Sequence, residues 1–493
     1  MLQYKNRVIT GVTHDSRKVV PGNVFVAVRG LTTDGHDYIQ QAVANGAELI
    51  ICEQDPLIEG IPYIKIKDSR AALAILARNF YNRPDLDLIT MGITGTNGKT
   101  TITTLLNHIF NENDISCGLI GSNGVSYTDQ YWDAILTTPD AVNLYYYLHQ
   151  MVEERVKVVA MEVSSHSLKQ KRVEGMQFNL ALFTNLSLDH LDLHGTYQDY
   201  LDTKLLLGKK LKPGGLIVYN KDDVIAGEIE NSFRQPKISY GIKVKSADIK
   251  GYLTKTTREG SEMEVRVNSS YLPYIGTFNI SSGLLGEHNA SNLLAAICCA
   301  LSFGLSPQEI AAAIVSFRGV KRRLEIIYNE KFTIVDDFCH NPANYEAVLR
   351  TVAVLPSNKI FLVTPVRGNR GELVNSENAK VIARWGKKLN LLKIIVTNSE
   401  DTVHPKDRVK GDEEIAFLKP LWQAGLNVSH TPTLTQGLEL VLDEVEAGDL
   451  VLLLGSHPFK SVGEKILKMT AQHNIFMGTG QIRQENQWQK TKQ

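Results

Sequence analysis

A glycine-rich loop at residues 95–100 has the residue types and the spacing of a phosphate-binding site. It separates an apolar run at 88–94 from a helical pattern at 100–110 and reads Gly95-Thr96-Asn97-Gly98-Lys99-Thr100. Glycines let backbone amides surround phosphate oxygens, and a helix N-terminus adds partial positive charge. Lys99 would then reach the outer phosphates and Thr100 would hold Mg²⁺. The strict P-loop spacing would place glycine at Ile93, and a tight turn with a solvated lysine is the alternative, but the strand–loop–helix context favours nucleotide binding.

Two later apolar runs end in side chains that suit a hard metal ion. The first, at 156–163, contains Glu162, and the second, at 180–186, leads into Asp189 and His190. The carboxyl ends of parallel strands share one edge of an open sheet, where ligands bind. Oxygen donors beside phosphates favour Mg²⁺ over zinc, and one histidine is compatible with that choice. Each residue alone would be an ordinary polar loop residue, but together with the phosphate loop they predict a metal–nucleotide site.

The hydrophobic pattern indicates the strands and helices that must bring these residues together. Short apolar runs separated by helical patterns are typical of doubly wound α/β sheets. We predict strands at 24–28, 49–52, 88–94, 156–163, 180–186, 216–220, 332–338, 360–366, 393–398 and 449–455. We predict helices at 38–47, 100–110 and 291–304, a linker at 81–87, and an antiparallel patch within 246–280.

Composition bounds the class of protein. A length of 493 residues corresponds to about three domains. Lys plus Arg and Asp plus Glu both number 53, which argues against a strongly basic nucleic-acid-binding protein. The sequence has no apolar run at its start and no apolar stretch of ~18 residues, so we expect a cytoplasmic protein without a membrane span. The cysteines lack metal-ligand spacing and are expected to be buried thiols, at Cys52, Cys117, Cys298, Cys299 and Cys339.

Several longer motifs resemble a single family. They are GTNGKTT at 95–101, MEVSSH at 161–166, FTNLSLDHLDLHGTYQDYLDTK at 183–204, GEHNASNLLAA at 286–296, HDSRKVVPGNVFVAVRGLTTDGH at 14–36 and LTTPD at 136–140. Together they resemble the Mur ligases, which are ATP-dependent amide-forming enzymes of peptidoglycan precursor synthesis, and in particular the MurE type. The resemblance is dense over the first two thirds of the chain.

This resemblance implies roles for particular residues. Lys99, His190 and Lys204 would be catalytic, and Lys204 matches the family's carbamylated lysine. The Mg²⁺ ligands would be Thr100, Glu162 and His190. ATP would contact Gly95, Thr96, Asn97, Gly98, Lys99, Thr100, Thr101, Asn289, Arg323 and Asp336. The UDP-MurNAc-peptide would contact Ser16, Thr137, Thr138, Ser164 and Arg172. Without the resemblance, Lys204 would be a solvated helix lysine, and Ser16 and Thr137 would be turn caps.

The architecture that the resemblance implies has three α/β domains. Residues 1–86 would bind the UDP substrate, residues 87–321 would form a central ATP-binding domain on a P-loop ATPase-type parallel sheet, and residues 322–493 would form a Rossmann-like domain for the incoming amino acid. The implied reaction adds an amino acid to UDP-N-acetylmuramoyl-L-Ala-D-Glu through an acyl phosphate, with ATP and Mg²⁺. We expect no nucleic-acid partner, no membrane insertion and a monomer.

The third part of the chain departs from the family pattern. Residues 397–401 read Thr-Asn-Ser-Glu-Asp where diaminopimelate-adding members carry Asp-Asn-Pro-Arg, and residues 455–459 read Gly-Ser-His-Pro-Phe in place of Gly-Lys-Gly-His-Glu. The missing glutamate contacts the far end of diaminopimelate in members that use it, which argues against that substrate. The run at 336–340, Asp-Asp-Phe-Cys-His, keeps the aspartate and histidine of the family's Asp-Tyr-Ala-His run. Arg367 and Arg370 are equally interpretable as receptors for an amino-acid carboxylate or as surface arginines.

Three alternative functions remain open at this point. A paralogue would keep the ligase chemistry but join a different amine to a different carboxylate, as the altered third part suggests. A nucleotide-binding regulator or scaffold would not need the complete set of Thr100, Glu162, His190 and Lys204. A folylpolyglutamate-synthase-like ligase shares the core chemistry, but the N-terminal UDP-type segment argues against it.

Overall fold

The carboxyl edge of a large, mostly parallel sheet organises the predicted site residues. The computed structural model describes residues 3–4, 7–30, 33–56, 60–187, 189, 191–257, 259–389, 391–456, 459 and 461–477. The chain forms two compact units. The first comprises Met1–Tyr252, Met263–Ser281 and Ala290–Phe317, and the second comprises Leu253–Glu262, Ser282–Asn289 and Arg318–Gln493.

The N-terminal part of the first unit is a small parallel sheet with strand order β3-β4-β5-β6. Its strands are short and apolar, and Phe25, Ile39 and Ile50 pack together on one side of it. The predicted strands at 24–28 and 49–52 correspond to β4 and β5. The elements are β1 Gln3–Tyr4, β2 Arg7–Val8, β3 Gly11–Thr13, η1 Ser16–Lys18, β4 Asn23–Val26, η2 Gly35–Tyr38, α1 Ile39–Ala44, β5 Leu49–Cys52, β6 Tyr63–Lys65 and α2 Ser69–Phe80.

The segment predicted as a linker at 81–87 is built into the first unit. It contains a short 3₁₀ helix, η3 Pro84–Leu86, in which the side chain of Asp85 is fully buried. The Asp85 carboxylate accepts hydrogen bonds from Arg78 Nε at 2.7 Å and from the Gln177 amide at 3.1 Å. A buried ion pair of this kind fixes the path of the chain between α2 and the strand that follows.

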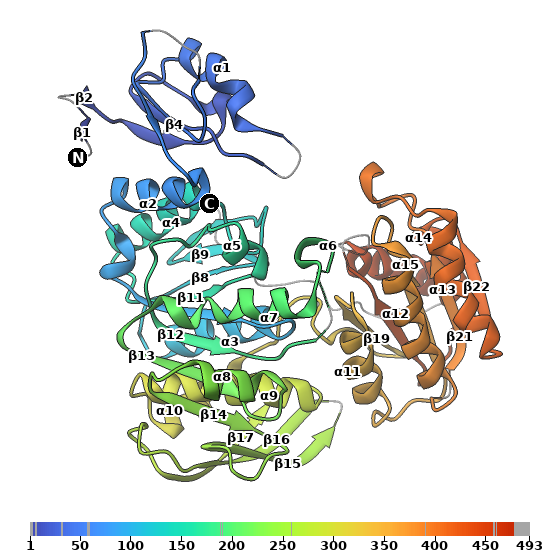
Figure 1. The fold of residues 1–493 in the computed structure, drawn as a ribbon. Coiled ribbons are helices and arrows are strands. Elements are labelled where there is room, and N and C mark those ends of the chain that lie inside the picture. The colour runs from blue at the N-terminus through green and yellow to red at the C-terminus, as the bar shows by residue number, and fades with distance from the viewer. Residues whose placement is uncertain are drawn as a thin grey trace. The chain divides into compact units, whose positions relative to one another are not determined.

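The central sheet has the strand order β10-β9-β8-β11-β7-β12-β13-β14-β15-β16-β17. Strands β8, β11, β7, β12, β13, β14 and β15 run parallel, and β9 and β10 form an antiparallel hairpin next to β8 (Figure 1). After β7 the chain crosses to β8 on one side, whereas after β12 it continues to β13 on the other side. The point where strand order reverses is where open α/β sheets bind ligands, and here it lies between β7 and β12.

The elements of the central region follow the predicted pattern closely. Strands predicted at 88–94, 156–163, 180–186 and 216–220 are β7, β11, β12 and β13, and α3 packs against β8 and β11. The bounds are β7 Ile89–Thr94, α3 Lys99–Glu112, β8 Cys117–Gly121, β9 Gly124–Tyr127, β10 Gln130–Trp132, α4 Ala141–Glu153, β11 Val158–Glu162, α5 Ser165–Lys169, β12 Phe178–Phe183, α6 Leu191–His194, α7 Tyr197–Leu205, η4 Gly208–Lys210, β13 Leu211–Asn220, α8 Ile225–Ser232, β14 Lys237–Gly241, β15 Ile249–Thr257, β16 Gly260–Val267, β17 Gly276–Ser282, α9 Glu287–Ser302 and α10 Pro307–Ser316.

The second unit contains another doubly wound sheet, with strand order β18-β19-β23-β20-β21-β22. Strand β18 is antiparallel to β19, and the remaining pairs are parallel. This confirms the predicted Rossmann-like pattern. The bounds are β18 Glu325–Asn329, β19 Thr333–Asp337, α11 Pro342–Val352, β20 Ile360–Pro365, α12 Gly371–Gly386, β21 Leu391–Thr397, η5 Pro405–Asp407, α13 Gly411–Gln423, β22 Val428–Thr431, α14 Leu434–Leu442, β23 Leu450–Leu454 and α15 Val462–Met477.

Two predictions about the whole chain can be compared with the structure. All five cysteines are unpaired and buried, which confirms the prediction of buried thiols. Within the part of the chain that the structure describes, no helix is both long enough and apolar enough to cross a bilayer.

Candidate functional site

The phosphate loop connects β7 to α3 at the reversal point of the central sheet. Gly95 and Gly98 have φ values of 143° and 88°, which side chains rarely adopt. A Cβ on Gly95 would overlap Thr184 Oγ1, and one on Gly98 would overlap Asn292 Oδ1. Only glycine therefore fits this loop, whose backbone turns tightly into the N-terminus of α3.

Two lysine side chains converge on this loop. Lys99 Nζ donates to the Gly95 and Thr96 carbonyl oxygens, each at 2.8 Å, and Lys204 Nζ donates to the same Gly95 oxygen at 2.8 Å. Lys204 is only 1% exposed and lies over the Tyr200 ring, 4.5 Å from its centroid. Burial, with the nearby Lys99 charge as a smaller cause, holds the pKa of Lys204 well below its usual value. The structure thus brings together two predicted catalytic lysines, one of them an amine that burial favours in its neutral, nucleophilic form.

Glu162 ends β11 beside the phosphate strand, because β11 pairs with β7 and places Glu162 opposite Ile93. The Glu162 carboxylate is buried and accepts a hydrogen bond from the Ser122 amide at 2.7 Å. A Cβ on Gly121 would lie 2.5 Å from Glu162 Oε1, so this glycine leaves room for the carboxylate. Thr100, the other described candidate metal ligand, is buried in the first turn of α3. Both offer oxygen atoms, which suit Mg²⁺.

The predicted third metal ligand, His190, lies outside the described residues. Among the residues that the structure does describe, no group of three or more His, Cys, Asp or Glu side chains is arranged to hold a metal ion. The oxygen donors of Thr100 and Glu162 are compatible with a hard cation whose remaining ligands are phosphates and water.

Four of the predicted substrate contacts adjoin Glu162. Thr138 Oγ1 donates to the Glu162 carbonyl at 2.7 Å and accepts from the Ser164 amide at 3.1 Å. Arg172 Nη1 donates to the Thr138 carbonyl at 2.8 Å, and Thr137 Oγ1 is 3.0 Å from Ser122 Oγ. These hydroxyls and this guanidinium form one network beside the candidate metal ligand.

Ser16, the fifth predicted substrate contact, belongs to the N-terminal sheet. It is 6% exposed, and its hydroxyl donates to Gln41 Oε1 at 2.7 Å. The Ser16 carbonyl accepts from Asn45 Nδ2 at 2.9 Å. Ser16 therefore ties the η1 turn to α1, as a structural serine does.

Two predicted nucleotide contacts of the second unit, Arg323 and Asp336, lie beside Arg322, which the sequence did not single out. Arg322 is 7% exposed and pairs with Asp336 at 3.1 Å, while its neighbour Arg323 lies over the Phe338 ring at 5.2 Å. Burial raises the pKa of Asp336 to about 7, although Arg322 opposes that rise. Asn289 is buried in the first turn of α9, where its amide donates to the Leu285 carbonyl at 2.9 Å.

Residues of the altered acceptor motif, and the two arginines near it, make hydrogen bonds and ion pairs within the second unit. The Asp401 carboxylate accepts from the Leu434 amide at 2.8 Å, in the first turn of α14, and from Lys465 Nζ at 2.7 Å. His457 and Pro458 lie outside the described residues. Arg367 donates through Nη1 to the His340 carbonyl, and the Arg370 amide donates to Glu413 at 2.8 Å.

Sequence reasoning missed Asn185 and Tyr200, which contact the phosphate loop, and His194, which packs against Tyr200. Asn185 hydrogen-bonds the Asn97 backbone, Tyr200 shares a 3.1 Å hydrogen bond with Thr96, and the His194 ring lies 5.1 Å from the Tyr200 ring. The His194 side chain is fully buried, and its Nδ1 is 3.0 Å from Asp199. The spacing of Tyr200 and Lys204, four residues apart on one helix, was the available signal for Tyr200.

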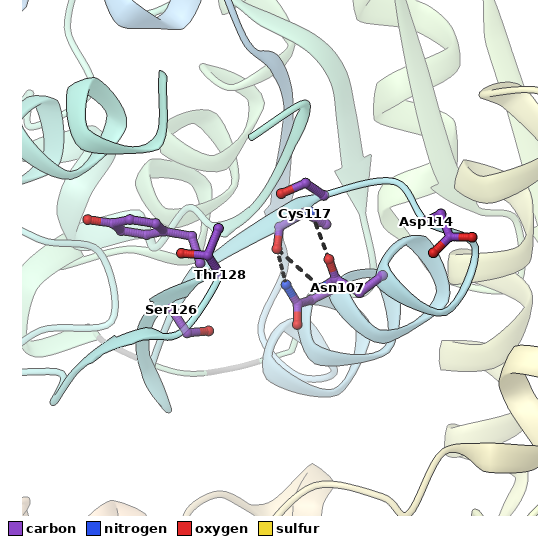
Figure 2. A pocket seen from close by; sticks show the side chains of 8 residues that line it. Asn107, Asp114, Cys117, Ser126 and Thr128 are labelled. Atoms are coloured by element: carbon purple, nitrogen blue, oxygen red, sulfur yellow. Dashed lines mark hydrogen bonds between the residues drawn. The ribbon is translucent and has the colours of Figure 1, made fainter. Parts of the chain in front are cut away.

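A separate cavity of about 310 Å³ lies away from these residues. Figure 2 shows it between the second half of α3 and the β9 hairpin, with Asn107 and Asn111 bonded to the backbone of Cys117. At a rise of about 1.5 Å per residue, Asn111 lies roughly 18 Å along α3 from Lys99. The cavity is lined by Asn107, Asn111, Asp114, Ser116, Cys117, Ser126, Tyr127 and Thr128.

Comparison with known proteins gives the family directly. The sequence matches the family models described as "Mur ligase middle domain" over residues 93–300, "Mur ligase family, catalytic domain" over 8–81, and "Mur ligase, glutamate ligase domain" over 322–457. A UDP-N-acetylmuramoyl-L-alanyl-D-glutamate--2,6-diaminopimelate ligase from Geobacillus kaustophilus is 33% identical, covering 93% of this chain and 92% of that protein. A ligase of the same name from Oceanobacillus iheyensis is 37% identical over 75% of each protein.

Solved structures show the same fold. MurF from Acinetobacter baumannii superimposes with a TM-score of 0.68 at 19% identity, covering 94% of both chains. MurF from Thermotoga maritima in complex with ADP gives 0.65 at 20% identity, covering 96% of this chain and 100% of that one. With three family models spanning most of its length and relatives above 30% identity, this chain belongs to the Mur ligase family.

Proposed function

We propose that this chain is an ATP-dependent, ADP-forming amide ligase that adds an amino acid to UDP-N-acetylmuramoyl-L-Ala-D-Glu in peptidoglycan precursor synthesis. In this proposal residues 1–86 bind the UDP end, 87–321 bind ATP and 322–493 receive the amino acid. Family membership and the names of the relatives support the activity. The observation that carries the proposal is the meeting of Lys99 and Lys204 at the Gly95 carbonyl, where the phosphate loop enters α3.

The phosphate loop is the proposed binding site for the phosphates of the nucleotide. Partial positive charge at the N-terminus of α3 and the Lys99 ammonium both attract phosphate oxygens. On nucleotide binding, Lys99 exchanges its two carbonyl acceptors for phosphate oxygens. Its positive charge then stabilises the negative charge of the phosphoryl group during transfer. Thr100, Glu162 and, by the family resemblance, His190 would hold Mg²⁺, which when bound neutralises charge on that group. Asn289, Arg323 and Asp336 are the proposed contacts to the rest of ATP.

Lys204 has the environment that carbamylation requires. A neutral amine attacks CO₂, the Nζ–C bond forms, and one amine proton leaves, which converts a buried base into an anion. Burial removes the ordinary obstacle, protonation of the amine, because it disfavours the charged form. The Lys99 ammonium shares the Gly95 oxygen with Lys204 and would stabilise the carbamate that results.

The substrate network beside Glu162 places a carboxylate for activation. Thr137, Thr138, Ser164 and Arg172 offer hydroxyl and guanidinium donors, which suit phosphates and carboxylates. The substrate carboxylate attacks the terminal phosphorus of ATP, ADP leaves, and an acyl phosphate forms. The amine of the incoming amino acid then attacks the acyl carbon, and inorganic phosphate leaves.

A second candidate is a paralogue that joins a different amine to a different carboxylate. The specific observation that favours it is that Asp401, at the place where the family's acceptor motif stands, is bonded to the first turn of α14 and to Lys465. The relatives are named as diaminopimelate ligases. In contrast, residues 397–401 of this chain contain no arginine of the kind that the diaminopimelate motif carries.

The test is phosphate release with ATP, Mg²⁺ and UDP-MurNAc-L-Ala-D-Glu, screened over amino acids including L-lysine and diaminopimelate. Turnover with one amine establishes the wall ligase and names its substrate. Lys204→Met should abolish turnover, and removal of bicarbonate should reduce it, whereas Lys209→Met, an exposed neighbour on the same segment, should leave it unchanged. Nucleotide binding without turnover on any amine would favour the paralogue.

A further inference from the structure

The phosphate loop is held from outside by the segment that follows β12. The Asn97 amide donates to Asn185 Oδ1 at 2.9 Å, and Asn185 Nδ2 donates back to the Asn97 carbonyl at 3.1 Å. Thr184 Oγ1 donates to the same carbonyl at 2.7 Å, and the Thr96 amide donates to the Asn185 carbonyl at 2.9 Å. The backbone N–H and C=O of one loop residue, Asn97, which belong to the two peptides on either side of its Cα, are thus both held by a single side-chain amide.

Further hydrogen bonds join the phosphate loop to residues 184–187 and fix those residues in turn. The Ser187 amide donates to Thr96 Oγ1 at 3.0 Å. The Asp223 carboxylate, at the end of the neighbouring strand, accepts from the Leu186 amide at 2.9 Å and from the Ile225 amide at 3.1 Å. Asp223 therefore anchors the 184–187 segment, and that segment in turn holds the phosphate loop.

Asn185 is suited to this position by its chemistry. A carboxamide carries an acceptor oxygen and two N–H donors, so it can satisfy the backbone N–H and C=O of one residue at once. A carboxylate can only accept and would set its second oxygen against the Asn97 carbonyl, while an aliphatic side chain satisfies neither group. The close approach at Gly95, where a Cβ would overlap Thr184, shows that the loop is packed directly onto this segment.

We propose that Asn185 is a positioning residue for nucleotide binding: it fixes the two peptides that flank the Asn97 Cα, so that the following amides at the start of α3 face the phosphates of ATP. The proposal rests on the proposed function in that it takes residues 95–101 to bind nucleotide phosphates. It makes Asn185 specific for the phosphate part of the ligand, since the side chain acts only through the phosphate loop.

The test compares Asn185→Ala and Asn185→Asp with the wild-type chain by calorimetric titration with MgADP and with adenosine. Loss of two hydrogen bonds that preorganise the loop should weaken MgADP binding by about 10- to 100-fold. Adenosine has no phosphates, so its affinity should stay unchanged. Asn185→Asp should bind MgADP more weakly than Asn185→Ala, because it also places negative charge near the phosphates.

Asn179→Asp is the matched control. Asn179 lies on β12, near the end opposite the segment that contains Asn185, and its Oδ1 accepts from the Thr90 amide at 3.0 Å and from Lys212 Nζ at 2.9 Å. An aspartate there keeps both acceptor roles, so MgADP affinity should be unchanged. Unaltered MgADP affinity in Asn185→Ala, or an equal loss for adenosine and MgADP, overturns the positioning role alone. Failure of the wild-type chain to bind MgADP would overturn the proposed function as well.

Discussion

Gly95→Ala is the substitution for which the structure gives the most definite expectation. The φ value of 143° at Gly95 costs a non-glycine residue about 1–3 kcal/mol. The new Cβ would also displace the Thr184 hydroxyl from the Asn97 carbonyl, and that hydrogen bond contributes about 0.5–1.5 kcal/mol. Taken together, restoring the phosphate-binding geometry in the variant should cost about 2–4 kcal/mol, which corresponds to roughly 30- to 1,000-fold weaker MgADP binding.

Calorimetric titration with MgADP measures this loss, and two further variants identify its cause. Gly214→Ala has a similar conformational penalty, since φ is 77°, but a Cβ there has no atom within 4 Å. It should lower the free energy of unfolding by about 1 kcal/mol and leave MgADP affinity unchanged. In Gly95→Ala/Thr184→Ala the displaced hydroxyl is gone, so the two substitutions should be non-additive and part of the affinity should return.

The reasoning would be refuted by either of two results. The first is a Gly95→Ala variant that binds MgADP as tightly as the wild type, which would mean that the loop binds phosphate in another conformation. The second is a double variant no better than Gly95→Ala, which would exclude the contact with Thr184 as a cause.

Three further expectations follow from buried groups. Gly121→Ala should raise the Mg²⁺ concentration needed for half-maximal phosphate release, because its Cβ would displace Glu162 Oε1; an unchanged Mg²⁺ requirement would remove Glu162 from the metal site. The folded-state pKa of Asp336, about 7, lies above its ordinary value of 3.8, so its contribution to stability is present below about pH 4 and is lost as pH rises through 7. Urea unfolding from pH 4.5 to 7.5 should show wild-type stability falling relative to Asp336→Asn by at most about 4 kcal/mol, and parallel curves would contradict this. Arg78→Met leaves Asp85 buried without its partner and should lower the free energy of unfolding by about 3–5 kcal/mol, with partial recovery in Arg78→Met/Asp85→Asn; urea titration decides whether that recovery occurs.

Sequence reasoning located β7, β11, β12 and β13 of the central sheet and β19, β20, β21 and β23 of the second unit, because buried parallel strands are short, apolar and bounded by polar turns. It did not predict β8, β14, β18 or β22. It also placed Glu162 and the phosphate loop at one sheet edge, since both follow directly from strand order. These predictions depended on local pattern and on the general rule for open α/β sheets, and the structure confirms them.

The residues that were missed depend on contacts distant in sequence. Asn185 acts on Asn97, 88 positions away, and nothing in its own neighbourhood marks that role. Arg322 and Arg323 are adjacent and chemically identical, so the sequence could not say which is buried. Which arginine is buried depends on the backbone conformation. Arg322 has φ of 60°, and this turn directs its guanidinium to Asp336. The buried Asp85 was likewise hidden within a Pro-containing segment typical of a linker.

The buried cysteines make the chain its own reporter of local opening. Thiol reagents attack the thiolate, and burial raises the pKa of Cys117 to about 12 and the pKa of Cys339 well above its usual value. Modification therefore requires the surrounding structure to open first. Cys52 lies in the N-terminal sheet, Cys117 in the central sheet and Cys339 in the second unit. The rates at which a thiol reagent modifies these three cysteines would then report the opening of three separate parts of the molecule, without any cysteine introduced by mutation.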